Sequence, residues 1–129
     1  MLVTDAGVWV RALVDEGPGD PIRARLVAEV AVAAPALIDL EFTNVLRGLV
    51  TKRSIALPDA ELAIAEFLQA PIQRYRHESL VPRVWQLREN LTAYDAAYVA
   101  LAEALGTELL TIDRGIAGAP GIRCRVVVV

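Results

Sequence analysis

Four acidic residues stand at the edges of apolar segments, where an unpaired charge is costly to hold. They are Asp5, Glu41, Asp95 and Asp113. Asp5 and Asp113 each close an apolar run, Asp95 opens one, and Glu41 lies inside one. A charge removed from water needs a partner, and a metal cation is a suitable one. If the four side chains converge, their oxygens would form a pocket for a divalent metal.

The rest of the chain offers little other catalytic chemistry. Its single histidine, His77, stands in a polar connection and is expected at the surface, and its single cysteine, Cys124, is expected to be buried or at an edge. A two-histidine acid–base pair and a His/Cys zinc site are therefore excluded. Neither a Gly-Lys-Ser/Thr phosphate loop nor a Gly-x-Gly-x-x-Gly fingerprint is present. Carboxylate oxygens favour Mg²⁺ or Mn²⁺, and phosphodiester hydrolysis is the reaction that most needs such a cluster.

Each acid also has an explanation that needs no metal. Asp5 could cap the helix that follows it, and Asp113 could form a turn through its own side chain. Asp95 follows a threonine at the spacing of a capping box. Glu41 lies well inside a predicted helix and caps nothing, so its alternative is an ion pair with Arg47 or another arginine. Capping and metal binding are compatible for Asp5 and Asp95, so both interpretations stay open.

The composition fits one domain in a reducing compartment. The 129 residues are enough to bury a core, and one cysteine excludes an intrachain disulfide framework. With no apolar run near the roughly 18 residues of a membrane span and no basic leader, we expect a cytoplasmic protein. The net charge of -3 argues against electrostatic coating of nucleic acid, although a local basic rim could steer a phosphate chain. A hydrophobic fraction of 55% predicts that another chain covers part of the surface.

The pattern along the chain predicts the elements that must position these acids. Strands are expected at residues 1–4, 72–75, 108–112 and 125–129, with a short segment at 32–34. Helices are expected at residues 8–14, 21–30, 36–51, 58–70, 80–91 and 92–105, with one helical turn at 114–117. An acidic, glycine-rich turn at 15–20 ends the first helix, and Leu68 is expected in the apolar stripe of the fourth.

Alternating strands and helices favour an α/β fold with a parallel sheet covered on both faces. In such sheets ligands bind beyond the carboxyl ends of the strands, where the strand order reverses. Asp5 and Asp113 each stand at the carboxyl end of a predicted strand. The two acids therefore share an expected location.

Four segments resemble, in order, the motifs of PIN-domain nucleases. They are residues 2–9, 40–47, 91–102 and 110–113, and each contains one of the four acids. More narrowly, the chain resembles VapC-type ribonuclease toxins of type II toxin–antitoxin modules. The resemblance spans residues 1–129 as a single PIN domain. It implies a three-layer α/β/α sandwich with a parallel sheet.

The resemblance also implies a function. It implies a Mg²⁺- or Mn²⁺-dependent endoribonuclease that acts on structured RNA such as tRNA or rRNA. It further implies a homodimer and a cognate antitoxin in the active-site groove. Two more residues, Asn44 and Thr111, are expected to orient the acids. The metal-binding and catalytic acids that match the family are Asp5, Glu41, Asp95 and Asp113.

One position departs from the family pattern. Gly7 stands where the family usually has Ser or Thr, so we expect weaker metal or substrate positioning. A degenerate PIN domain that only binds RNA or protein therefore remains an alternative. A phosphorylation receiver is disfavoured, because Lys52 lies in the wrong region, and a small-molecule phosphatase would need Asp in place of Gly7. Arg47 and Arg114 are either solvated surface charges or contacts for RNA phosphates.

Overall fold

A computed structural model describes residues 1–15 and 20–129, and it contains a five-stranded sheet with the order β3-β2-β1-β4-β5. Every pairing between neighbouring strands is parallel. The strand order reverses between β1 and β4. Strands β2 and β3 lie on one side of β1, whereas β4 and β5 lie on its other side. The strands are β1 (Leu2–Thr4), β2 (Val32–Pro35), β3 (Ile72–Tyr75), β4 (Leu109–Thr111) and β5 (Val126–Val128).

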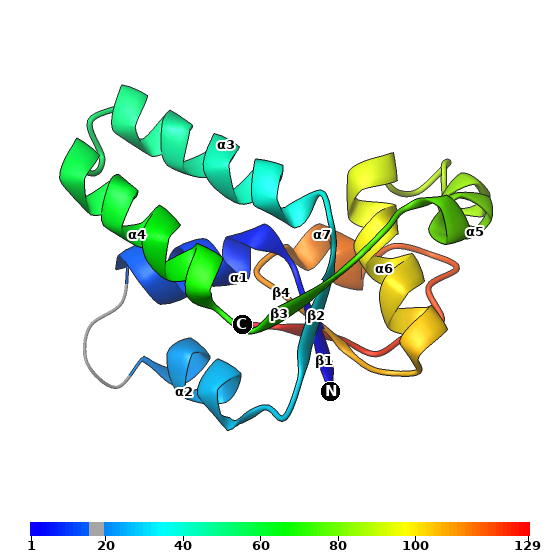
Figure 1. The fold of residues 1–129 in the computed structure, drawn as a ribbon. Helices are drawn as coiled ribbons and strands as arrows, with labels where there is room; N and C mark the ends of the chain where they lie inside the picture. The colour runs from blue at the N-terminus through cyan, green and yellow to red at the C-terminus, as the bar shows by residue number, and fades with distance from the viewer. Residues whose placement is uncertain (16–19) are drawn as a thin grey trace.

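Helices cover both faces of this sheet. Figure 1 shows α1 to α4 on one side and α5 and α6 on the other. None of the described helices is both long and apolar enough to cross a bilayer. The helices are α1 (Ala6–Val10), α2 (Pro21–Ala28), α3 (Ile38–Thr51), α4 (Leu57–Gln69), α5 (Val81–Gln86), α6 (Ala93–Leu105) and α7 (Arg114–Ala117), with a π-helical segment at Arg11–Asp15 and a 3-10 turn at Glu78–Leu80.

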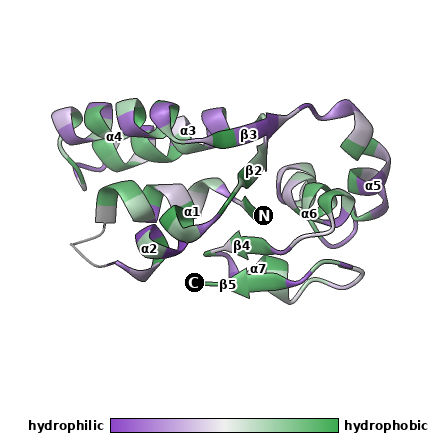
Figure 2. Ribbon diagram, turned by 60° about the horizontal axis from the view of Figure 1, so that its bottom comes forward, coloured by the Kyte–Doolittle hydropathy of each residue, from purple (hydrophilic) through white to green (hydrophobic). Residues whose placement is uncertain are grey.

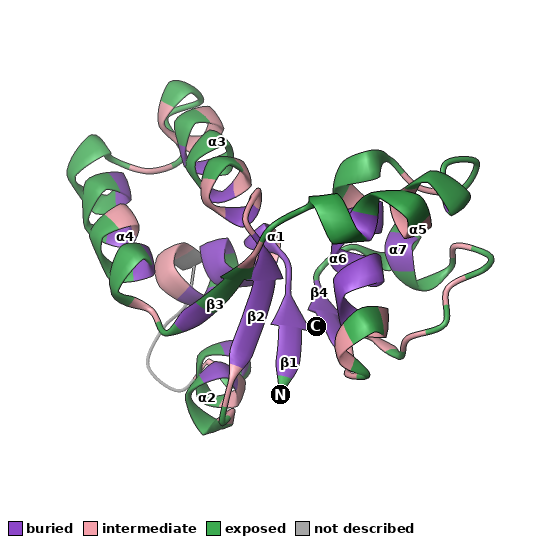
Figure 3. Cartoon of the chain, turned by 45° about the vertical axis from the view of Figure 1, so that its right-hand side comes forward, coloured by how far each residue is buried: buried purple, intermediate pink, exposed green. Residues whose placement is uncertain are grey.

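The central strands are short and completely buried. Every residue of β1, β2 and β4 is buried, as the colouring of Figure 3 shows for β1 and β2. A strand covered on both faces is apolar at successive positions, which explains the continuous runs Leu2-Val3 and Leu109-Leu110. In Figure 2 the ribbon of β5 is likewise hydrophobic throughout, whereas α4 alternates between hydrophobic and hydrophilic positions. The predicted parallel α/β fold is confirmed.

The structure corrects several predicted boundaries. The segment at 32–34 is a full strand that ends at Pro35. The first helix begins at Ala6 rather than residue 8 and continues to residue 15 with wider π-type turns. The helices predicted to reach Val30 and Leu91 end earlier, at Ala28 and Gln86. Most of the turn predicted at 15–20 lies outside the described residues.

The prediction that Leu68 belongs to the apolar stripe of α4 is wrong. Leu68 is 65% exposed, and the buried positions of α4 are Ala60, Ala63 and Phe67. The ring of Phe67 stacks on that of Phe42 in α3, with the centroids 4.0 Å apart. This aromatic contact fixes which face of α4 turns inward and leaves its neighbour Leu68 outside.

Two contacts anchor the start of α3, the helix that carries Glu41. The backbone N–H of Leu37 donates to Nε2 of His77 across 3.1 Å. Two residues further, Asp39 forms an ion pair with Arg74 at 2.8 Å. His77 is exposed, as expected, but it also supplies an acceptor at the first turn of α3. These contacts tie α3 to the end of β3 and to the connection that follows it.

We expect His77→Ala to lower the free energy of unfolding by about 1 kcal/mol, because the N–H of Leu37 loses its acceptor. Urea denaturation measures the change. Ser79→Ala is the control, because Ser79 is an exposed residue of the same connection and its loss should cost less than about 0.5 kcal/mol. Equal effects of the two substitutions would contradict the assigned contact.

Candidate active site at the carboxyl end of the sheet

The four acids gather at the edge where β1 and β4 end. Asp5 follows β1 directly, and Asp113 follows β4 after one intervening residue. Glu41 comes from the first turn of α3, and Asp95 comes from the first turn of α6. β1 and β4 are the neighbours between which the strand order reverses, so this edge is the expected ligand-binding position of a parallel sheet.

Burial and mutual repulsion both raise the pKa values of acids at this site. Burial is the main reason that the pKa of Asp5 rises to about 6, and the charges of Glu41 and Asp95 raise it further. Burial also raises the pKa of Glu41, and the charge of Asp95 adds to the effect. Burial raises the pKa of Asp95 as well, and here the charge of Asp113 adds. Each acid is therefore coupled to at least one other, as expected for carboxylates that share a site.

Asp5 is the most firmly held of the four. It is only 8% exposed. Its Oδ1 accepts a hydrogen bond from the backbone N–H of Val8 at 3.0 Å, and its Oδ2 accepts one from the hydroxyl of Thr111. Both bonds lower the pKa of Asp5, although less than burial raises it. The predicted helix cap is confirmed, and the same cap fixes the carboxylate at the site.

Thr111 joins the two strand-end acids. Its hydroxyl donates to Asp5 and accepts from the backbone N–H of Asp113 at 2.9 Å. Thr111 is fully buried at the end of β4. These contacts are the ones that its predicted orienting role requires. Asn44, the other residue predicted to orient the acids, is exposed on α3 and hydrogen-bonds to none of them in the described part of the chain.

Asp95 and Asp113 also make the local contacts that the sequence suggested. The backbone N–H of Asp95 donates to the hydroxyl of Thr92 at 3.2 Å, so Thr92 caps α6. Oδ1 of Asp113 accepts from the backbone N–H of Gly115 at 2.7 Å, so Asp113 caps α7. The predicted capping and the gathering of the acids thus occur together.

Glu41 has a partner that the sequence did not predict. The hydroxyl of Tyr98 donates to Oε1 of Glu41 at 2.6 Å. The expected alternative, an ion pair with Arg47, is wrong, because no basic residue within the described ranges pairs with Glu41. Part of the signal was available in the sequence, although not the identity of the partner. Tyr98 lies three residues after Asp95 and therefore shares its helical face, and a buried tyrosine needs a partner for its hydroxyl.

A second buried contact was also missed. The indole N–H of Trp9 donates to the hydroxyl of Thr4 at 2.8 Å, and Thr4 is fully buried. The bond joins α1 to the last residue of β1. Asp5 lies between these two residues in sequence, so the bond helps to fix the chain on either side of it.

None of the four acids forms an ion pair with a basic residue in the part of the chain that the structure describes. Other partly buried acids do: Glu103 pairs with Arg83, and Glu108 pairs with Arg25. The four-acid site therefore carries excess negative charge, and all its side-chain ligands are oxygens. This chemistry suits a hard divalent cation.

The acids do not form a finished metal site as they stand. Within residues 1–15 and 20–129, no three carboxylate, imidazole or thiol groups are close enough together to hold a metal ion. Binding must therefore move at least one carboxylate toward the others. Asp113 is exposed and Glu41 is half-buried, so both have more freedom to move than Asp5.

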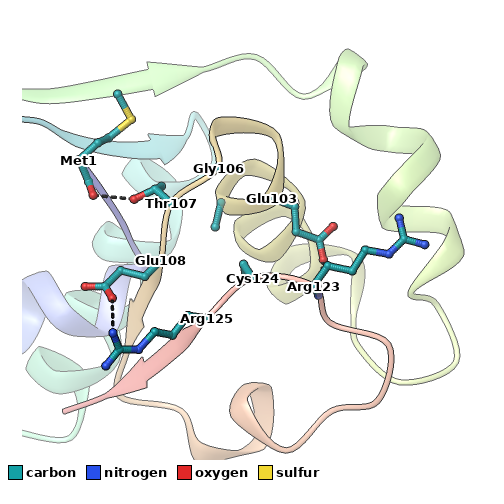
Figure 4. Close-up of a pocket in the computed structure, with 9 residues that line it drawn as sticks. Met1, Glu103, Gly106, Thr107, Glu108, Arg123, Cys124 and Arg125 are labelled. Carbon is teal, nitrogen blue, oxygen red and sulfur yellow. Dashed lines mark hydrogen bonds and ion pairs between the residues drawn. The ribbon is translucent and has the colours of Figure 1, made fainter.

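A separate cavity of about 690 Å³ lies at the opposite edge of the sheet, where β1 and β4 begin (Figure 4). Its two acids, Glu103 and Glu108, are both paired with arginines. Burial and the charge of Glu103 raise the pKa of the half-buried Cys124 in its wall, which keeps this thiol protonated and weakly reactive. The cavity therefore lacks the charge and the nucleophile of a catalytic site.

The profile of the PIN domain family matches residues 2–121. The chain belongs to the PIN-domain family. Ribonuclease VapC1 of Mycobacterium tuberculosis is 39% identical over 125 residues, which cover 96% of this chain and 94% of VapC1. Ribonuclease VapC9 of the same species is 34% identical over 129 residues, covering 100% of this chain and 98% of VapC9. Within the PIN-domain family, the chain therefore falls among the VapC ribonucleases.

Two solved structures share the fold. VapC20 of Mycobacterium tuberculosis superposes with a TM-score of 0.67 at 15% identity, covering 95% of this chain and 99% of VapC20. FitAcB of Neisseria gonorrhoeae superposes with a TM-score of 0.70 at 17% identity, covering 98% of this chain and 96% of the other. The predicted PIN-like α/β/α sandwich is confirmed.

Gly7, where we expected a departure from the PIN-domain pattern, lies against the side chain of Ile112. A Cβ on Gly7 would lie 2.7 Å from the Cδ1 and Cγ1 atoms of Ile112 and 3.5 Å from Oδ1 of Asp5. Ile112 thus occupies the room that a larger residue would need. A hydroxyl still reaches Asp5, from Thr111. Ile112 therefore fills the space beside position 7, and Thr111 of β4 supplies a hydroxyl to Asp5.

We expect Asp5→Asn to raise the free energy of unfolding of the metal-free protein by up to about 3 kcal/mol at neutral pH, because the amide buries no charge. The folded pKa of about 6 lies above the ordinary value of 3.8. The wild-type protein therefore loses stability as the pH rises through this window, and the variant does not. Urea denaturation with a chelator, at the two ends of the window, measures the difference. A gain that is the same at both ends, or that also appears in the exposed control Asp59→Asn, would contradict the assignment.

We expect Gly7→Ser to cost about 1 kcal/mol of stability, because the new Cβ must displace Ile112. The cost should shrink in an Ile112→Ala background, and a double-mutant cycle by thermal denaturation measures this coupling. Gly48→Ser is the control, because a Cβ there meets no atom within 4 Å. It should be neutral or stabilising by up to about 0.5 kcal/mol. Additive effects at positions 7 and 112 would rule out the proposed steric conflict.

Proposed function

We propose that this chain is a metal-dependent endoribonuclease, the toxin of a toxin–antitoxin pair, which hydrolyses RNA phosphodiester bonds. The observation that carries the proposal is the gathering of four carboxylates that have no basic partner among the described residues. The full-length relatives VapC1 and VapC9, both named ribonucleases, support RNA as the substrate.

The four acids would hold Mg²⁺, or Mn²⁺ in its place. When bound, the ion would supply a hydroxide nucleophile and neutralise charge on the leaving oxygen. Asp5 provides the fixed point, since both of its oxygens accept hydrogen bonds. Asp95 and Glu41 approach from two different helices, and Asp113 is the most exposed of the four. Thr111 holds Asp5 and the backbone of Asp113 in register.

Exposed arginines beside the site would hold the RNA backbone. Arg114 follows Asp113 directly and is exposed, and Arg47 is exposed on α3, the helix that carries Glu41. Neither arginine pairs with an acid in the described ranges, so both are available to phosphate oxygens. Such contacts position the substrate without reading its sequence. A structured RNA of the tRNA or rRNA class is the proposed substrate, and the structural relative VapC20, a toxin that cleaves the sarcin–ricin loop, supports this class.

Protein partners are also proposed. A second copy of the chain and a cognate antitoxin would cover apolar surface that the fold leaves exposed. The proposed location is the cytoplasm, where the RNA substrate is found. The related FitAB complex was solved with a DNA fragment, which fits a toxin whose partner binds DNA. The exposed apolar side chains on α3 and α4 are Leu40, Val45, Leu57, Leu62 and Leu68.

A binding module without catalysis is the second candidate. Two observations favour it: Ile112 fills the room beside Gly7, and the carboxylates do not stand in a finished metal site. Such a protein would bind RNA or the antitoxin and leave RNA intact. Against it, burying Asp5 among other acids brings a binding surface no advantage.

We expect Asp95→Asn and Asp5→Asn each to lower the rate of RNA cleavage in Mg²⁺ by more than about 100-fold, because each removes a carboxylate from the metal site. Sequencing of RNA ends after incubation with purified protein measures the rate and the cleavage site. Asp59→Asn, which changes an exposed acid on α4, should cleave like the wild-type protein.

Full activity in both site variants would overturn the endoribonuclease proposal. RNA binding by the wild-type protein without cleavage, at any concentration of Mg²⁺ or Mn²⁺, would support the binding module instead.

A further inference from the structure

We propose that Tyr98 is a positioning residue whose hydroxyl holds Glu41 in the direction in which it can join the other acids around a metal ion. The inference rests on the proposed metal-dependent function, and it adds a residue that belongs to none of the four acidic positions. Tyr98 acts through Glu41 and touches neither RNA nor the reacting atoms.

One hydrogen bond orients the carboxylate of Glu41. The hydroxyl of Tyr98 donates to Oε1 of Glu41 at 2.6 Å, the short distance expected when an O–H donates to an ionised carboxylate. Glu41 has no other hydrogen bond or ion pair from its side chain in the part of the chain that the structure describes. Asp5, by contrast, is held through both oxygens. Without the phenol, nothing described would prevent the Glu41 carboxylate from turning toward solvent.

Tyr98 itself cannot move easily. It is only 1% exposed and lies on α6 within a buried stretch from residue 96 to residue 102. Its ring is part of the hydrophobic core, and α6 packs on β1, β2 and β4. A rigid core residue therefore presents one polar atom to a half-buried carboxylate from α3. The bond joins α3 and α6, which lie on opposite faces of the sheet (Figure 1).

The surroundings of the phenol support this role. Burial, and then the bond to Glu41, raise the pKa of Tyr98 far above its ordinary value, and the charges of Asp5 and Asp95 add to the effect. In the structure the hydroxyl is the donor of the bond to Glu41. The bond engages only Oε1, so it orients Glu41 and leaves the other carboxylate oxygen, Oε2, available.

The test compares Tyr98→Phe, which keeps the ring and removes the hydroxyl, with Tyr75→Phe. Tyr75 also donates from its hydroxyl, to Gln73 at 3.4 Å, but contacts no acid of the site. Mg²⁺ binding is measured without RNA, by calorimetry and by the rise in melting temperature with added Mg²⁺. We expect Tyr98→Phe to weaken Mg²⁺ binding about 10- to 100-fold and Tyr75→Phe to leave it unchanged.

A double-mutant cycle shows whether Tyr98 acts through Glu41. In a Glu41→Gln background, Tyr98→Phe should weaken Mg²⁺ binding by much less than it does in the wild-type background. In RNA cleavage, Tyr98→Phe should raise the Mg²⁺ concentration at half-maximal rate, and saturating Mg²⁺ should restore most of the rate. This recovery distinguishes a loss of positioning, which saturating Mg²⁺ overcomes, from a loss of folded protein, which it would not restore.

Unchanged Mg²⁺ affinity in Tyr98→Phe would overturn the proposal. So would an equal loss in the wild-type and Glu41→Gln backgrounds, since Tyr98 would then act on the site as a whole. If the wild-type protein binds Mg²⁺ but cleaves no RNA, the proposed function fails while the binding cycle still decides the role of Tyr98.

Discussion

The site depends on one electrostatic constraint: carboxylates are held close together, partly out of water, without basic residues among the described ones to neutralise them. Burial and repulsion raise the pKa of Asp5 to about 6, and they raise those of Glu41 and Asp95 as well. A neutral donor can stabilise an ionised carboxylate without cancelling its charge. The protein supplies such donors from the backbone of Val8 and from the hydroxyl of Thr111. The negative charge therefore remains available to a metal ion.

The local fold supplies many of these donors because the acids stand where helices begin. Asp5 caps α1, Asp113 caps α7, and Asp95 lies in the first turn of α6. The first turn of a helix has backbone N–H groups without partners inside the helix. In a parallel sheet the chain leaves each strand at the same edge and enters a helix there. Capping and the proposed metal binding therefore use the same residues, and finding a cap at an acid does not argue against a functional role.

Asp5 receives a hydroxyl contact from another strand and not from position 7. Position 7 has no side chain, Ile112 fills the space beside it, and Thr111 brings its hydroxyl to Asp5 from β4. The hydroxyl of the buried residue Thr111 thereby joins Asp5 to the backbone of Asp113. Ile112, which is 43% exposed, lies at the rim of the site.

The sequence by itself determined the parallel α/β fold and the helix caps at Asp5, Asp95 and Asp113, because buried strands and helix starts leave short, local patterns. Strand β3 and helix α7 were predicted with their observed limits. Only the tertiary structure decided the partner of Glu41, the exposure of Leu68 and the neighbour of Gly7. Each of these depends on a contact between segments far apart in the chain: Tyr98 with Glu41, Phe42 with Phe67, and Ile112 with Gly7. Periodicity shows which face of an element is apolar, but packing decides which side chain from another element meets it.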